Sequence, residues 1–423
     1  MSRREFRRVL AGASSQTLAT VLVVQVLLLF SGIITIRALG SDGRGALAII
    51  WIVPFAIAFL GGLGLPQATV YFVARAGPAL APTVRLVARI AACQIAVLTP
   101  LYGLIYLFAV EPSYPETDTA GIISLGSIAA LIGQSTGLAV LQGQQRFTAF
   151  SACRVFPSAL YTASVSILYA TGSDSLELIT LALIGSWLFG SALTWSLAAI
   201  GSREPDSGCP PPLRQILSFG VRGMIGSVSP VDDLRVDQML VGFAAGAQPL
   251  GLYVAAASFT NLPKFVAQSV GLVAYPRIAS APGEREAWAI SRRTLIRGSS
   301  LVVAVVVALL AVVPFILPVL YGSEFEDSVP LAETLLVATV FLGVRRLIGE
   351  VGRGLGYPSI GSIGEIASIL ILALSLVAIS GGSPGAQDVA WSVVIASLAS
   401  LLVVSALLLS AKRASLPQSD DLE

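Results

Sequence analysis

Long apolar stretches separated by short polar loops run through the whole chain. Stretches of about 20 apolar residues, the length that an α-helix needs to cross a bilayer, recur from one end to the other. This pattern predicts an all-α, polytopic membrane protein. We expect about twelve transmembrane helices, over residues 11–36, 46–73, 84–109, 119–140, 150–170, 177–200, 215–245, 250–275, 297–320, 329–352, 357–380 and 387–411.

The charged residues of the intervening loops fall into two alternating sets. Arginine predominates in one set, which includes the segment before residue 11 and the loop at 278–296, and acidic residues predominate in the other. Basic loops of membrane proteins are retained on the cytoplasmic side. The alternation therefore predicts that both termini are cytoplasmic.

Composition narrows the possible chemistry. Hydrophobic residues make up 55% of the 423 residues and charged residues only 12%, roughly half the charged share of a soluble domain. The chain has no histidine, and Cys93, Cys153 and Cys209 lack the spacing of a metal site. It also lacks a P-loop for ATP. We therefore predict that it is not an enzyme, holds no metal or cofactor, and does not bind nucleic acid.

The two halves of the chain resemble repeats of each other. The turn at Leu39-Gly40 has a counterpart at Ala245-Gly246, and the segment 143–147 has one at 354–358. A polar, proline-rich linker at 201–212 separates the halves, so we predict two six-helix lobes, 1–205 and 206–423. Six spans per lobe give both lobes the same orientation, which implies a pseudo-two-fold axis along the membrane normal and a cavity between the lobes. The alternative is a chance similarity of turns in a chain with 40 glycines.

One apolar stretch, residues 218–277, carries an unusual number of charges. A charge near the bilayer centre costs a few kcal/mol or more, so such residues normally face a wet cavity or a partner. If this stretch begins with one helix over 215–245, Arg222 and Asp233 share a face, and Asp237 follows one turn later. A kink at Pro230 would separate the two groups. The charged residues of the stretch include Arg222, Asp232, Asp233, Arg235, Asp237 and Lys264.

Several short motifs resemble those of a known group of transporters. In order and spacing they are similar to the polysaccharide and oligosaccharide flippases of the multidrug, oligosaccharidyl-lipid and polysaccharide exporter superfamily. The motifs are ITIRALGSDGRGALAI at 34–49, GLGLPQATVYFVAR at 62–75, RVDQMLVG at 235–242, GLYVAAASF at 251–259, AYPRIA at 274–279 and VLYGSEF at 319–325.

The resemblance implies a function and a location. A member of this group turns a polyprenyl-diphosphate-linked oligosaccharide from the inner to the outer leaflet of the plasma membrane by alternating access, for synthesis of a cell-surface polysaccharide such as O-antigen. The implied partners are the lipid-linked oligosaccharide, membrane lipids, and a glycan polymerase with its glycosyltransferases; the implied state is a monomer. Asp237 lies where the group commonly carries an aspartate. Fourteen spans are common in parts of the superfamily, and the first lobe here lacks the deep acidic residues of some relatives.

The cations of the 218–277 stretch suit a diphosphate headgroup, because arginine pairs with phosphate oxygens in a low-dielectric cavity. We predict that Arg222, Arg235 and Lys264 bind the substrate. Alternatively, Arg222 pairs with Asp233, and Arg235 forms a structural pair with Asp232. Asp233 and Asp237 are candidates for binding a coupling proton or sodium ion, because a carboxylate that moves between wet and dry surroundings changes its proton affinity. They could instead only neutralise the neighbouring arginines.

Other polar residues in the spans have local interpretations. Arg346 and Glu350 are one helical turn apart and are expected to pair, and Glu365 could answer the same basic cluster. The first lobe carries Gln25, Gln67, Gln94 and Gln134, which we expect to form hydrogen bonds between helices. Contact of one or two of them with a sugar is the alternative.

Two other functions are compatible with this chain. One is a cation-coupled multidrug antiporter of the same superfamily, whose cavity would be acidic and aromatic. The other is a membrane scaffold that assembles glycan-synthesis enzymes without transport. The three cations predicted deep in the spans favour an anionic substrate.

Overall fold

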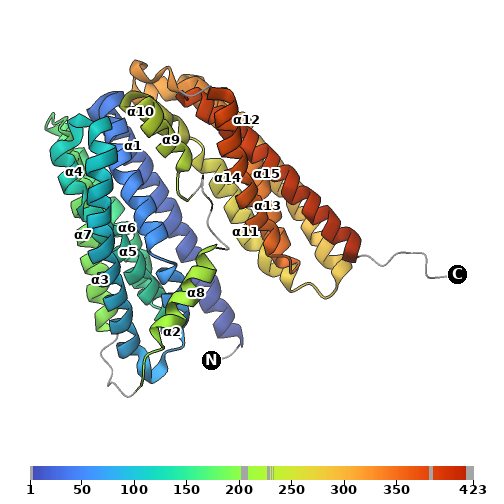
Figure 1. The fold of residues 1–423 in the computed structure, drawn as a ribbon. Coiled ribbons are helices and arrows are strands. Elements are labelled where there is room, and N and C mark those ends of the chain that lie inside the picture. Colours follow the sequence, from blue (N-terminus) through green and yellow to red (C-terminus); the bar gives the residue numbers. More distant parts are fainter. Residues whose placement is uncertain are drawn as a thin grey trace. The chain divides into compact units, whose positions relative to one another are not determined.

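The computed structural model describes residues 3–201, 208–225, 229, 231, 233–380 and 384–415 (Figure 1). Helices form the regular structure throughout these ranges, which contain no strand. The predicted all-α class is confirmed.

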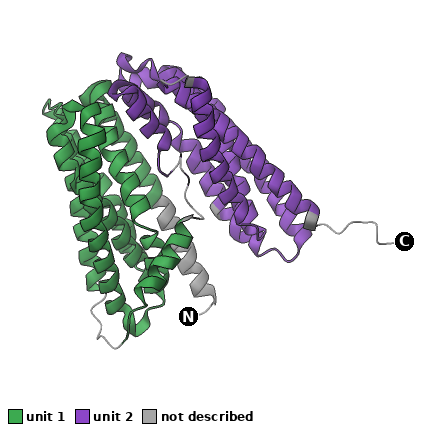
Figure 2. Cartoon of the chain, in the orientation of Figure 1, with its two compact units in different colours: residues 1–225 green, residues 226–423 purple. Residues whose placement is uncertain are grey.

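The chain divides into two compact units, Met1–Ile225 and Gly226–Glu423 (Figure 2). The division falls after Ile225, whereas the sequence suggested a boundary at 205/206 within the linker. The difference arises because α8 (Leu213–Ile225) packs on α2 (Leu65–Ala74) of the first unit. Phe219 of α8 stacks on Tyr71 of α2, with ring centroids 4.5 Å apart.

The first unit is built around α5, which packs against α1, α2, α3, α6 and α7. α5 has this place because all but two of its side chains are buried or half-buried. Besides α2 and α8, the helices of this unit are α1 (Arg3–Gly61), α3 (Leu80–Ile105), α4 (Asp118–Ser124), α5 (Gly126–Gly143), α6 (Phe147–Ala170) and α7 (Leu176–Ile200).

The second unit is built in the same way around α13, which packs against α10, α11, α12, α14 and α15. Its helices are α9 (Val236–Ala245), α10 (Ala247–Ser258), α11 (Asn261–Ala279), α12 (Glu284–Tyr321), α13 (Ser328–Gly354), α14 (Ser359–Ser380) and α15 (Ala386–Ser415).

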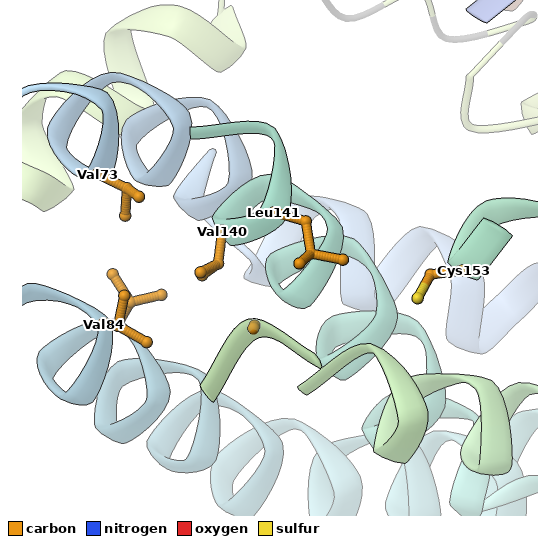
Figure 3. Packing of buried hydrophobic residues seen from close by; sticks show 7 residues of the cluster. Val73, Val84, Val140, Leu141 and Cys153 are labelled. Atoms are coloured by element: carbon orange, nitrogen blue, oxygen red, sulfur yellow. The ribbon is translucent and has the colours of Figure 1, made fainter. Parts of the chain in front are cut away.

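The core of the first unit is formed by apolar side chains contributed by several helices. Val73 of α2, Val84 of α3, Val140 and Leu141 of α5 and Cys153 of α6 form one buried cluster (Figure 3). Burying such side chains away from lipid and water gains dispersion contacts, which drive helix association in membranes.

Both predicted repeat turns have the same backbone conformation in the two units. Gly40 kinks α1 at φ 66°, ψ −170°, and Gly246 separates α9 from α10 at φ 92°, ψ −168°. Both φ values are positive, and glycine adopts positive φ without the steric penalty of a Cβ atom. The first pair of repeat turns is therefore equivalent in structure as well as in sequence.

The second pair of turns ends the two central helices, α5 and α13. Each is a Schellman motif, in which a residue of positive φ follows the helix and two backbone N–H groups bond back to the last carbonyls. The positive-φ residues are Gln145 (58°) and Gly356 (90°). The equivalent bonds run from Gln145 N to Gln142 O and Arg146 N to Leu141 O, and from Gly356 N to Arg353 O and Tyr357 N to Gly352 O.

Helices lie within all twelve ranges predicted as spans, but several are interrupted. By length and composition, six described helices can cross a membrane alone, or seven if the bent pair α4 and α5 is one span. The number is below twelve partly because α1 continues through the Gly40 kink and covers two predicted spans. Other predicted spans are broken into shorter helices, such as α8 with α9 and α10 with α11.

Candidate functional site

The predicted continuous helix over 215–245 is wrong. α8 ends at Ile225 and α9 begins at Val236. Of the residues described between them, Asp233 and Leu234 donate their backbone N–H groups to the carbonyl of Ser229, which forms a turn. The predicted shared helix face of Arg222 and Asp233 is therefore also wrong, because no helix connects them. Pro230 and Asp232 lie outside the described residues.

Arg222 belongs to the first unit. It is exposed on α8, and its Nε donates to the carbonyl of Ser218 at 3.2 Å. Together with Arg214 and Ser218 it lines a hollow along this helix. The positive charge is thus available to a ligand on the surface of α8.

Asp237 is the buried carboxylate of the second unit, with 5% of its surface exposed. It lies in the first turn of α9, where the helix dipole favours a negative charge. Its Oδ2 accepts a hydrogen bond of 2.9 Å from the hydroxyl of Tyr253 on α10, which is fully buried. Its Oδ1 is buried and has no hydrogen-bond partner among the described residues. Half of this carboxylate is therefore left for another ligand.

Lys264 and Arg235 provide positive charge near Asp237. Lys264 lies in the first turn of α11 and is half-buried, and Arg235 is exposed immediately before α9. Both act electrostatically on Asp237. Arg235 has the left-handed backbone of φ 52°, ψ 43°, an uncommon conformation for a residue with a Cβ. The second unit thus brings Arg235 and Asp237, at the start of α9, near Lys264 of α11.

Asp233 has a different role from Asp237. Its Oδ2 accepts the backbone N–H of Ser229 at 2.7 Å, and it is half-buried. This carboxylate stabilises the turn between α8 and α9, in the way that aspartate side chains commonly support turns. Protonation of Asp233 would weaken that bond.

Tyr253 is a residue of this candidate site that the sequence did not indicate. It follows Asp237 by sixteen residues and lies on the next helix, so the contact forms only because the Gly246 turn folds α10 back beside α9. From the sequence, a tyrosine in an apolar stretch is interpreted as an ordinary core residue. Gln238, next to Asp237, also has a buried Oε1 without a described partner.

Two predictions about the α13 basic cluster have different outcomes. Glu365 of α14 does pair with it: Arg345 Nη1 lies 2.7 Å from Glu365 Oε1. Glu350, however, accepts a hydrogen bond from Arg353 rather than forming the predicted pair with Arg346. Arg346 and Arg353 both lie about one helical turn from Glu350, and the side-chain rotamer of Glu350 decides which arginine it contacts.

Among the glutamines of the first unit, Gln134 joins helices as predicted, and Gln94 joins α3 to the turn between α1 and α2. Gln134 is buried, donates to the carbonyl of Cys153 at 2.8 Å and accepts from Thr194 at 3.1 Å. Gln94 donates to the carbonyl of Gly62 at 3.1 Å. Gln25 and Gln67 are instead exposed.

Comparison with solved structures identifies the fold. An inward-facing multidrug resistance MATE transporter of the MOP superfamily aligns with a TM-score of 0.71, at 14% identity, over 93% of this chain and 96% of that one. The lipid II flippase MurJ in an inward closed conformation aligns with a TM-score of 0.69, at 14% identity, over 93% of this chain and 87% of that one. A Vibrio cholerae MATE transporter aligns with a TM-score of 0.59, at 13% identity, over 96% of this chain and 99% of that one.

Comparison with protein families is more specific. A search of curated protein sequences gives no match. The family model described as polysaccharide biosynthesis protein matches residues 41–330, which is more than half of the chain and includes all five predicted site residues. The chain therefore belongs to the polysaccharide biosynthesis protein family, as a multi-pass membrane protein whose fold is similar to those of MATE transporters and MurJ.

Proposed function

We propose that the protein is a flippase that moves a polyprenyl-diphosphate-linked oligosaccharide from the inner to the outer leaflet of the plasma membrane by alternating access. The observation that carries this proposal is the exposure of Arg222 on α8 within an apolar membrane protein. An arginine facing hydrocarbon is strongly unfavourable, so this side chain needs water or an anion. The family of the chain supplies the context of polysaccharide synthesis.

The cations bind the diphosphate. A guanidinium fork matches the geometry of phosphate oxygens, and an ammonium adds a point charge. Arg235 and Lys264 belong to the second unit and Arg222 to the first. The sugar head moves through the protein with the diphosphate, while the prenyl tail stays in lipid.

Asp237 and Asp233 couple transport to a cation. The buried Oδ1 of Asp237 has no hydrogen-bond partner among the described residues, so this oxygen can take up a proton or coordinate a sodium ion. Asp233 stabilises the turn before α9 through Ser229, so cation binding there would change the conformation of that turn. A cation that binds one conformation more tightly shifts the population towards it.

Fluorescence quenching in proteoliposomes tests the proposal, with a labelled polyprenyl-diphosphate disaccharide as substrate. Arg222→Ala removes a charged contact worth about 1.5–3 kcal/mol, so we expect transport to fall about tenfold or more. Arg285→Ala is the control, because Arg285 is an exposed arginine of α12 that does not line the hollow along α8. Equal transport by Arg222→Ala and wild type would exclude Arg222 from diphosphate binding.

A cation-coupled multidrug antiporter is the second candidate. It is favoured by the buried Asp237 carboxylate, which suits a cationic drug, and by the similarity of the fold to MATE transporters. Drug-sensitivity assays of a deletion strain separate the two functions. Deletion of a flippase of this kind should change the surface polysaccharide and leave drug resistance unaltered.

A further inference from the structure

A hollow of about 480 Å³ lies within the first unit, between α2, α5 and the start of α6. Its size falls in the range of roughly 300–1,000 Å³ typical of small-molecule sites. None of the residues that line it is charged. Those that matter here are Gln67, Val70, Ser135, Leu138, Gln142 and Phe150.

The polar side chains of the hollow are exposed on a helix that is otherwise covered. Of the 18 residues of α5, only Ser135 and Gln142 are exposed. They are seven residues apart, so they lie on one face about 10.5 Å apart along the helix axis. Gln67 adds a third exposed polar side chain from α2. Amides and hydroxyls that face hydrocarbon lose their hydrogen bonds. This face is therefore suited to water or to a polar ligand.

The chemistry of the hollow fits a neutral polyol. Each glutamine amide offers two N–H donors and a carbonyl acceptor, and the Ser135 hydroxyl, which donates to the carbonyl of Ile132, keeps its acceptor capacity. Val70, Leu138 and the Phe150 ring provide an apolar floor. A sugar ring has the complementary surface, with hydroxyls along its edge and C–H groups on its face.

The repeat gives an independent comparison. The Schellman turns of α5 and α13 are related by a shift of 211 residues. By the same shift, Arg346 is the position equivalent to Ser135, and Arg353 is the position equivalent to Gln142. Arg353 is exposed and pairs with Glu350, and Arg346 is half-exposed. The same helix face thus carries neutral polar side chains in the first repeat and charged side chains in the second. The neutral hydrogen-bonding face is therefore a feature of the first unit.

We propose that this hollow binds a sugar residue of the transported glycan. Gln67 and Gln142 hydrogen-bond its hydroxyl groups, Ser135 accepts from another hydroxyl, and Phe150 packs against the ring face. This inference rests on the proposed flippase function. It assigns sugar binding to the first unit, separately from the cations assigned to the diphosphate.

Binding of two probes to the full-length protein in phosphatidylcholine nanodiscs tests this assignment. One probe is geranylgeranyl diphosphate, and the other is geranylgeranyl-diphosphate-glucose. Wild type should bind the glucose-bearing probe more tightly. The double variant Gln67→Leu/Gln142→Leu should lose about 10- to 100-fold in affinity for that probe and keep its affinity for the sugar-free one.

Two further variants keep the result interpretable. Gln25→Leu makes the same chemical change at an exposed glutamine of α1 outside the hollow, and should bind both probes like wild type. Ser135→Trp should block the hollow and weaken only the glucose-bearing probe. If wild type binds both probes equally, or the double variant weakens both equally, the sugar site is wrong. If wild type binds neither probe, the flippase proposal itself fails.

Discussion

Asp237 is a carboxylate that the fold keeps away from solvent, with Tyr253 on one oxygen and positive charge nearby. A buried ion of this kind costs free energy unless hydrogen bonds and opposite charges compensate it. Arg345 is a buried cation whose partner, Glu365, is half-buried, and a structural role is sufficient for this pair.

Replacement of Tyr253 by Phe removes the hydroxyl that bonds Asp237. We expect the free energy of unfolding to fall by about 1–3 kcal/mol, because a charged acceptor is left buried with fewer partners. Thermal unfolding in detergent measures the loss. The cost of Tyr253→Phe should shrink in an Asp237→Asn background, where the acceptor is neutral. Equal costs in both backgrounds would mean that the hydrogen bond to the carboxylate contributes nothing.

At the scale of helices, the contact between α2 and α8 depends on two glycines. Gly64 has φ 68°, and a Cβ at this position would lie 2.1 Å from the carbonyl oxygen of Gly220. A Cβ on Gly220 would lie 2.6 Å from the carbonyl of Leu63. The two backbones thus approach more closely than any larger residue allows. This crossing explains why the first half of the predicted seventh span belongs to the first unit.

Gly220→Ala should separate α8 from α2. Overpacking against backbone typically costs about 1–3 kcal/mol, since a carbonyl cannot move aside as a side chain can. Protease cleavage in the 201–212 linker should become faster, because α8 would no longer be held on α2. Gly185→Ala on α7 is the control, as no atom lies within 4 Å of the added methyl. Unchanged stability and cleavage of Gly220→Ala would contradict the close crossing.

The whole molecule is a membrane protein made of two units with equivalent central helices and equivalent turns. In each unit, five helices of that unit pack against the central helix. They are α1, α2, α3, α6 and α7 around α5, and α10, α11, α12, α14 and α15 around α13. The equivalent central helices and turns favour duplication of one ancestral unit over chance similarity of glycine turns. The orientation of both units in the membrane follows from the charges of their loops and stays a prediction.

Cysteine labelling in intact cells tests that orientation. Cys209 is exposed and belongs to a loop of the basic set, so a membrane-impermeant maleimide should label it only after permeabilisation. A cysteine introduced as Ser113→Cys, in an acidic loop, should react in intact cells. Both tests use a Cys93→Ser background, because Cys93 is also exposed. The opposite labelling pattern would invert the topology.

The sequence by itself determined the features that depend on local interactions. Apolar length predicts the helices, because each residue of a helix bonds within its own segment. The repeat turns were also predictable, because Gly40, Gly246 and Gly356 supply positive φ values at the residues where the backbone needs them. Glu365 was correctly matched to the basic cluster, since few charges were available in the apolar surroundings to pair with it.

Only the tertiary structure decided the features that depend on contacts between distant segments. The break between α8 and α9 replaced the predicted helix because α8 packs on α2 rather than continuing into the second unit. Tyr253 reaches Asp237 through the Gly246 turn, and Ser135 and Gln142 stand out because packing covers the rest of α5. Periodicity shows which residues share a face, but burial depends on which neighbouring helix covers that face.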